Sequence, residues 1–277
     1  MKKHMIVLTA AACGGIVLHG GNLIQGGDAE GTENPWGKKT TVVTAAPHAG
    51  KACYAITETV ATANSPLIPV DPAKKYRLSG ALKSADGEKL SICCFGIAMY
   101  DAGKRPIHKS NVWVVPGTET ELAAPAEKGA QEIRITNGDK WNKRRSTRSQ
   151  VAFNVKGDGS DMPNFELTSL ISRVKKSGDG QTWTVIFDRP LGKAYPAGTP
   201  VRQHFYGASL DCCLAWRSVP AVWTTYKAEI GGMAPAGQAP ANQFWHGCKY
   251  VSIYILNDAG RKGAAVHFDD IVFEEIR

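Results

Sequence analysis

Short runs of alternating apolar and polar residues fill most of the chain, and Gly, Pro, Asn or Asp bound most of them. Alternation with a period of two is typical of strands that bury one face. The clearest examples are residues 76–82 (YRLSGAL) and 182–187 (TWTVIF). The pattern therefore predicts an all-β protein with short strands joined by turns.

The predicted strands follow this punctuation from end to end. They are Gly21–Gln25, Lys39–Thr44, Ala52–Glu58, Ser65–Val70, Tyr76–Ser84, Leu90–Tyr100, Asn111–Pro116, Glu132–Thr136, Gln150–Val155, Thr182–Asp188, Pro200–Tyr206, Leu210–Trp216, Thr224–Ile230, Tyr250–Asn257 and Ala264–Glu275. Residues 164–175 fit a short helix and a loop followed by a strand equally well. Many short strands at regular spacing favour a β-sandwich or barrel. No repeat of about 20–50 residues points to a propeller or solenoid.

The composition changes between residues 128 and 205. This region holds the basic stretch KWNKRRSTRS (140–149), two Gly/Asp-rich turns and the Pro/Gly-rich AYPAGTP (194–200). We therefore predict one β-sandwich built from residues 21–127 and 206–277, interrupted by a smaller β insertion at 128–205.

Residues 1–20 have the pattern of a secretory leader. Lys2 and Lys3 precede an apolar stretch with three consecutive alanines at 10–12. Those alanines, followed by Cys13, also resemble a bacterial lipobox, which would attach a lipid to Cys13. The pattern predicts secretion or location in the cell envelope. The alternative is that residues 16–24 simply begin the first strand.

The chain has seven cysteines, and removal of Cys13 with the leader would leave six. An oxidising compartment permits disulfides. Neighbouring residues on a strand point to opposite faces, so at most one of Cys93 and Cys94, and one of Cys212 and Cys213, can face the core. The sequence leaves open whether any of them pair or all are free. The chain has no CxxC motif, so the sequence supports neither a zinc ribbon nor a thioredoxin-type site.

A net charge of +8 favours anionic partners, such as an acidic glycan or an envelope surface. In the basic stretch, Arg144 and Arg145 are candidates to bind sulfate, phosphate or uronate groups. The alternative is a solvated loop. Only Trp141 lies among these charges, so we do not expect nucleic acid binding, which needs interleaved aromatic residues.

Five segments form an ordered series: GNLIQGGDAEG (21–31), HAGKACYAI (48–56), SPLIPVDPAKKYRLSGALKS (65–84), FGIAMYDAGKRPI (95–107) and HFDDIVFEEI (267–276). Together they resemble the motifs of jelly-roll carbohydrate-binding modules of the galactose-binding-like superfamily, such as families 4, 9, 16 and 22. The resemblance implies a jelly-roll β-sandwich. Such modules bind sugars or act as spacers. The insertion has no counterpart in a minimal module, and Ala29 replaces the usual aromatic residue.

The resemblance also implies that the first and last strands lie side by side with a structural Ca²⁺ between them. Matched by motif, Glu30 and Asp270 or Asp269 would supply carboxylates, and residues 49–51 would supply backbone oxygens. Ca²⁺ prefers such oxygen ligands, and it would offset the cost of burying an aspartate in a hydrophobic run. The alternative is that Asp270 accepts backbone N–H bonds while Asp269 is solvated.

Sugar binding needs aromatic rings that stack on C–H faces and planar polar groups that bind hydroxyls. The candidates are Trp36, Trp113, Tyr206, Trp216, Gln243 and Trp245. Large aromatic residues also dominate sandwich cores, so we expect only part of this set to be exposed.

Signatures of catalysis are weak. The chain has no HExxH, GxSxG or Walker motif. Arg202, His204 and Tyr206 are residue types that a lyase would use, but a short run of them is more often structural. The leading hypothesis is an exported, non-catalytic protein that binds a polysaccharide or cell-surface glycan. A structural or assembly protein and a glycan-active lyase or hydrolase are the alternatives.

Overall fold

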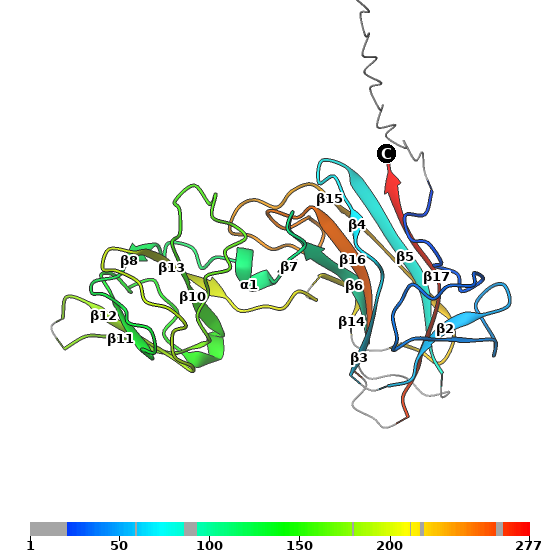
Figure 1. Ribbon diagram of the computed structural model, residues 1–277, viewed down its shortest axis with the longest axis horizontal. Coiled ribbons are helices and arrows are strands. Elements are labelled where there is room, and N and C mark those ends of the chain that lie inside the picture. The colour runs from blue at the N-terminus through cyan, green and yellow to red at the C-terminus, as the bar shows by residue number, and fades with distance from the viewer. Residues whose placement is uncertain are drawn as a thin grey trace, which may run out of the picture.

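The computed structural model describes residues 21–277 except 59, 86–92, 179, 211, 217–218 and 259–262, and of residues 214–216 only the backbone. The described residues form a two-layered β-sandwich with a smaller β insertion at one end (Figure 1). The predicted all-β class is confirmed. The leader and Cys13 lie outside the described residues. Among the described residues, no helix is long and apolar enough to cross a membrane.

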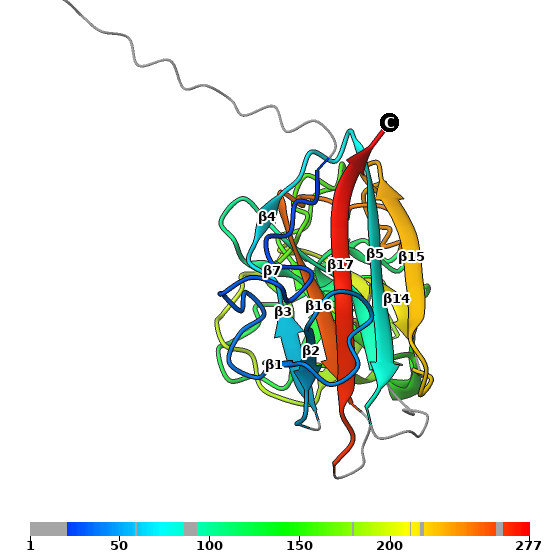
Figure 2. The same ribbon diagram turned by 90° about the vertical axis from the view of Figure 1, so that its right-hand side faces the viewer.

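The first sheet has five antiparallel strands in the order β1-β2-β17-β5-β15. Their bounds are Thr41–Val43 (β1), Cys53–Ile56 (β2), Val266–Ile276 (β17), Lys75–Ser84 (β5) and Thr224–Gly231 (β15). The three long strands β17, β5 and β15 run side by side (Figure 2).

The second sheet has the order β14-β6-β16-β3, with β4 also paired to β16 and β7 to β6. Its strands are Cys212–Trp216 (β14), Cys93–Tyr100 (β6), Tyr250–Asn257 (β16), Ala61–Asn64 (β3), Ile68–Pro69 (β4) and Pro106–Ile107 (β7). Alternation along β6 and β16 separates its two faces. Phe95 and Ile253 belong to the main core between the sheets, whereas Cys94 and Tyr254 form a second cluster on the outer face.

The N-terminal segment lies along β17, at the other end of the chain. Leu23 donates its N–H to the carbonyl of Phe273 (2.7 Å), and Ile271 donates to the carbonyl of Gly27 (2.9 Å). A Cβ on Gly27 would lie 2.0 Å from the Ile271 carbonyl oxygen, so only glycine fits this approach. The two chain ends therefore pair as the resemblance implies.

The insertion consists of two small sheets with their own core. One has the order β10-β13-β8 and the other β11-β12-β9. The bounds are Thr120–Glu121 (β8), Glu132–Ile135 (β9), Ser149–Phe153 (β10), Ile171–Lys176 (β11), Trp183–Phe187 (β12) and Pro200–Phe205 (β13). Because β8 pairs with β13 and Leu122 belongs to the insertion's core, the insertion begins before residue 120, earlier than the predicted boundary.

Some predicted elements differ from the structure. Residues 21–25 form no strand, since they join β17 through single bonds rather than a ladder. Residues 111–116 are not a strand either: helix α1 (Lys109–Val112) occupies their start and links the insertion to the sandwich (Figure 1). The ambiguous segment 164–175 is a loop followed by β11. A short 3₁₀ helix, η1 (Arg145–Thr147), lies in the basic stretch.

Candidate functional site

Two groups of aromatic and cationic side chains lie where α1 meets the end of β13, and they are joined through the consecutive residues Phe205 and Tyr206. Trp113 and Phe205 have ring centroids 4.5 Å apart. The Lys109 ammonium lies 4.4 Å from the centre of the Trp113 ring, and the Arg148 guanidinium lies 4.3 Å from that of Tyr206. We call these five residues the junction cluster. Tyr206 is 39% exposed, so its ring is open to solvent.

Backbone hydrogen bonds fix the positions of these rings. The N–H of Phe205 donates to the carbonyl of Trp113 (2.9 Å), and that of Tyr206 donates to the carbonyl of Arg148 (2.8 Å). The η1 turn therefore ends with Arg148 against the last residues of β13. The cluster combines residues from three separate segments, so sequence proximity alone could not reveal it.

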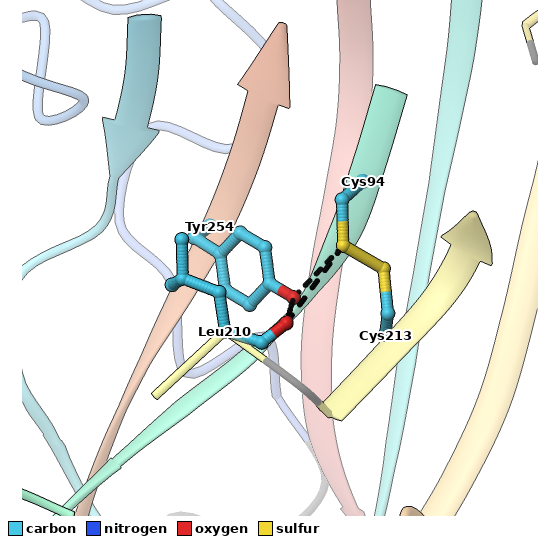
Figure 3. Close-up of a disulfide and its surroundings, with 4 residues drawn as sticks. All are labelled: Cys94, Leu210, Cys213 and Tyr254. Atoms are coloured by element: carbon cyan, nitrogen blue, oxygen red, sulfur yellow. Dashed lines mark hydrogen bonds between the residues drawn. A yellow bond between two sulfur atoms is a disulfide. The ribbon is translucent and has the colours of Figure 1, made fainter. Parts of the chain in front are cut away.

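The loop after β13 crosses from α1 to the outer face of the second sheet. At one end, the Ser110 hydroxyl donates to the carbonyl of Gly207 (2.8 Å). At the other, the Tyr254 hydroxyl donates to the carbonyl of Leu210 and contacts the Cys94 sulfur (2.9 Å), as Figure 3 shows. The loop that carries Tyr206 is thus anchored at both ends.

A disulfide joins Cys94 of β6 to Cys213 of β14 beside this loop (Figure 3). Their neighbours Cys93 and Cys212 are free thiols buried in the main core. The expectation that each vicinal pair has at most one member in the core is confirmed. The disulfide uses the two outward cysteines, a pairing that the sequence had left open.

Two predicted ligand-binding tryptophans belong to the core instead. Trp36 and Trp245 are only 1% and 0% exposed, so neither ring offers a face to a ligand. Trp36 packs edge-on against Phe268, with the ring centroids 5.1 Å apart. Trp245 donates its ring N–H to the carbonyl oxygen of Pro240 (3.1 Å). This corrects the prediction: their bulk fills the sandwich.

The other predicted residues are spread over the molecule. Gln243 is half-buried in the loop before β16, and Trp216 lies in β14, with only its backbone described. Arg144 is exposed at the start of η1, and Arg145 pairs with Asp188 (3.0 Å). Only Trp113 and Tyr206 join the same cluster. Its other ring and its two cations were not among the predicted site residues.

The three predicted metal-binding carboxylates converge on the loop 48–52. Glu30 accepts the N–H groups of Lys51 (2.6 Å) and Ala52 (3.0 Å). Asp269 accepts those of His48 (3.1 Å) and Ala49 (3.3 Å). Asp270 lies beside the imidazole Nδ1 of His48 (2.6 Å), not against backbone N–H groups. In the described part of the chain, no three His, Cys, Asp or Glu side chains are grouped as a metal site.

The alternative in which Asp270 accepts backbone N–H bonds and Asp269 is solvated is wrong, because the two aspartates have the opposite arrangement. Asp269 is fully buried and Asp270 only partly so. Burial raises the pKa of Asp269, against the opposing effect of its backbone donors. The N–H groups of Lys51 and Ala52 lower the pKa of the exposed Glu30. Loop 48–52 therefore supplies donors to two carboxylates.

Two of the three residues that a lyase might use, Arg202 and His204, are buried and hydrogen-bonded, whereas Tyr206 is exposed. His204 is 0% exposed; its Nε2 accepts from Arg202 (2.8 Å) and its Nδ1–H donates to the carbonyl of Ser110 (2.6 Å). Arg202 also donates to Asp161 (2.7 Å). Burial lowers the pKa of His204 to about 4. The imidazole is neutral at pH 7 and has both nitrogens occupied, so it is not accessible as a general base.

Comparisons with protein-family models and with curated protein sequences find no match. Among solved structures, the chain is similar to the CBM22-1 xylan-binding domain from Paenibacillus barcinonensis, with 11% identity over 97% of this chain and 99% of that one (TM-score 0.37). It is also similar to a family 16 carbohydrate-binding module, with 12% identity over 91% and 99% (TM-score 0.34). These likenesses are distant, and we derive no ligand from them.

Proposed function

We propose that the protein binds carbohydrate, without catalysing its conversion, through the junction cluster. The exposed Tyr206 ring beside the Arg148 guanidinium is the observation that carries the proposal. Such a ring can stack on the C–H face of a pyranose, while the guanidinium donates hydrogen bonds to hydroxyl or carboxylate oxygens. Among the residues that the structure describes, no carboxylate pairs with Lys109 or Arg148, and such cations favour a glycan that carries uronate or sulfate groups.

The non-catalytic character is supported by the bonding of the residues nearest the cluster. His204 and Arg202 are buried and bonded to protein partners, so neither can reach a ligand on Tyr206. The cluster itself offers rings, an ammonium and a guanidinium. It has no carboxylate pair of the kind that glycoside hydrolysis requires.

A glycan array with neutral and acidic polysaccharides tests this proposal. The full mature chain should bind a defined glycan, and Tyr206→Ala should weaken that binding at least tenfold because the stacking platform is lost. Arg148→Ala should weaken it as well. The matched control is Arg145→Ala, which removes a charge of the same segment that pairs with Asp188. No binding by the folded wild-type chain, or a larger loss with Arg145→Ala than with Arg148→Ala, would contradict the proposal.

We further propose that Glu30, Asp269 and Asp270 hold a structural Ca²⁺ with backbone carbonyls of residues 49–51. The donor chemistry fits in part: carboxylate oxygens from both chain ends face one loop. However, Glu30 and Asp269 accept hydrogen bonds from backbone N–H groups of this loop, and N–H groups cannot coordinate a cation. EDTA should lower the melting temperature, and added Ca²⁺ should restore it. An unchanged melting temperature would leave these carboxylates as anchors of the loop alone.

Export to the cell envelope or outside the cell is also a proposal. It is supported by the leader pattern of residues 1–20 and by a disulfide, which an oxidising compartment favours. Fractionation of the native host, followed by mass spectrometry of the mature protein, tests it. Cleavage near the alanines at 10–12 with recovery outside the cytoplasm is expected, and a lipidated Cys13 would add membrane anchoring. An intact N-terminus in the cytoplasm would contradict it.

A further inference from the structure

A groove lies on the insertion, and none of the junction cluster's residues lines it. Two adjoining hollows of about 400 and 280 Å³ share Phe153, Phe165 and Glu166 in their walls. The first extends to Lys193 and Tyr195, and the second to Arg105 in the turn after β6. Small-molecule sites typically have volumes of roughly 300–1,000 Å³, so the groove is large enough for one.

Aromatic residues line the groove, but Phe153 and Tyr195 are only 1% and 8% exposed and belong to the insertion's core. The rings of Phe153 and Tyr195 stack at 3.7 Å and are nearly parallel. Phe165 is partly exposed, and the Arg105 guanidinium lies 4.0 Å from its ring centre. The Lys193 ammonium lies 5.0 Å from the centre of the Tyr195 ring. Phe165 is therefore the ring that the groove exposes in part, beside the Arg105 guanidinium.

The polar groups of the groove centre on Glu166. Its Oε2 atom accepts hydrogen bonds from the Asn154 amide (2.7 Å) and the Lys193 ammonium (2.8 Å). Lys193 holds the pKa of Glu166 below its usual range. Asn154 has φ +54°, a left-handed backbone conformation that asparagine tolerates better than most residues. This conformation directs the amide toward the carboxylate.

Each cation of the groove has its own carboxylate. Arg105 pairs with Asp101 (2.8 Å), and Lys193 pairs with Glu166. The groove is therefore electrically balanced, in contrast with the junction cluster. It remains partly open, because the side chains of Glu166 and Lys193 are 39% and 55% exposed. A neutral ligand with several hydroxyls matches such a surface, since hydroxyls both donate to carboxylates and accept from amides and ammonium groups.

We infer that this groove is a second carbohydrate site, specific for a neutral saccharide, on the insertion. The exposed part of the Phe165 ring would contact a C–H face, while Asn154, Glu166 and Lys193 would bind hydroxyls. The inference extends the proposed function to another surface and stands on its own residues. A chain with two such sites would bind a mixed polysaccharide with higher avidity than either site alone.

The test uses the full chain labelled with ¹⁵N and titrated with neutral hexasaccharides of glucose, xylose, mannose and galactose and with a hexauronate. Amide signals of residues 153–154, 165–168 and 192–195 should shift with at least one neutral sugar. The double variant Asn154→Gly/Lys193→Met should reduce that affinity at least tenfold. Glycine accepts the left-handed backbone and methionine keeps the apolar stem, so both changes preserve the fold. Lys128→Met, at an exposed lysine outside the groove, is the control.

The outcomes separate this inference from the proposed function. Groove shifts that persist in Tyr206→Ala support a second site. Shifts confined to the surroundings of Trp113 and Tyr206 would overturn the inference and leave the proposed function standing. Shifts confined to the groove would support the inference and remove the junction cluster as the site. An absence of shifts with every sugar would overturn both.

Discussion

Two arginine–aspartate pairs of the insertion differ in their surroundings. The side chains of Arg202 and Asp161 lie 2.7 Å apart and are 2% and 6% exposed. Those of Arg145 and Asp188 lie 3.0 Å apart and are 69% and 24% exposed. A buried charge that loses its partner remains desolvated, whereas an exposed one is solvated by water. Residues with the same chemistry should therefore contribute differently to stability.

Asp161→Asn should lower the free energy of unfolding by about 3–5 kcal/mol, because it leaves Arg202 charged, buried and without its carboxylate. The matched variant Asp188→Asn should cost less than about 1 kcal/mol. Chemical denaturation of both variants measures the difference. Equal effects would show that the buried pair does not stabilise the junction.

His204 should make stability depend on pH. Burial lowers its pKa from 6.5 to about 4, so the unfolded chain binds more protons than the folded chain between these values. The contribution of His204 to the free energy of unfolding is therefore fully present above about pH 6.5, and it is lost as the pH falls toward 4. Thermal unfolding across this range measures the slope, and His204→Gln should flatten it while keeping an acceptor for Arg202. An unchanged slope in that variant would exclude His204 as its cause.

At the scale of elements, the loop between β13 and β14 depends on contacts at both ends. The Cys94–Cys213 disulfide lies beside the end that Tyr254 holds through the Leu210 carbonyl (Figure 3). The cross-link joins residues 119 positions apart. It therefore restricts the unfolded chain strongly.

Cys94→Ser/Cys213→Ser should lower the free energy of unfolding by about 2–4 kcal/mol. It should also weaken binding at Tyr206, because the loop loses part of its support. Denaturation and glycan binding of the double variant, compared with the wild type before and after reduction, measure both effects. If reduction of the wild type changes neither stability nor binding, the disulfide does not support this loop.

Elements with clear alternation were predictable, and those without it were not. The runs that became β5 and β12 alternate along their length, so each shows the face that it buries. Short strands such as β7 (Pro106–Ile107) and β8 (Thr120–Glu121) carry no such period. The pattern of residues 111–116 predicts a strand, but the side chain of Asn111 caps α1 by accepting the N–H of His108 (2.7 Å). Local hydrogen bonding overrode the apolar pattern there.

At the scale of the whole molecule, the insertion determines where ligands can bind. It contributes Phe205, Tyr206 and Arg148 to the junction cluster and almost all of the inferred groove. The sequence identified the insertion and two of the five cluster residues. It could not identify Lys109 or Arg148 as partners of the rings, because only folding brings α1, η1 and β13 together. Trp36 and Trp245 show why aromatic type alone is insufficient: ligand binding requires exposure, which the sequence does not give.

The most direct test of the central claim is calorimetric titration of the full chain with an oligosaccharide of the glycan that the array selects, compared between wild type and Tyr206→Ala. We expect saturable binding to the wild type and at least a tenfold loss, about 1.4 kcal/mol, in the variant with its melting temperature unchanged. Equal affinity of the two proteins would contradict the claim that the junction cluster is the carbohydrate site.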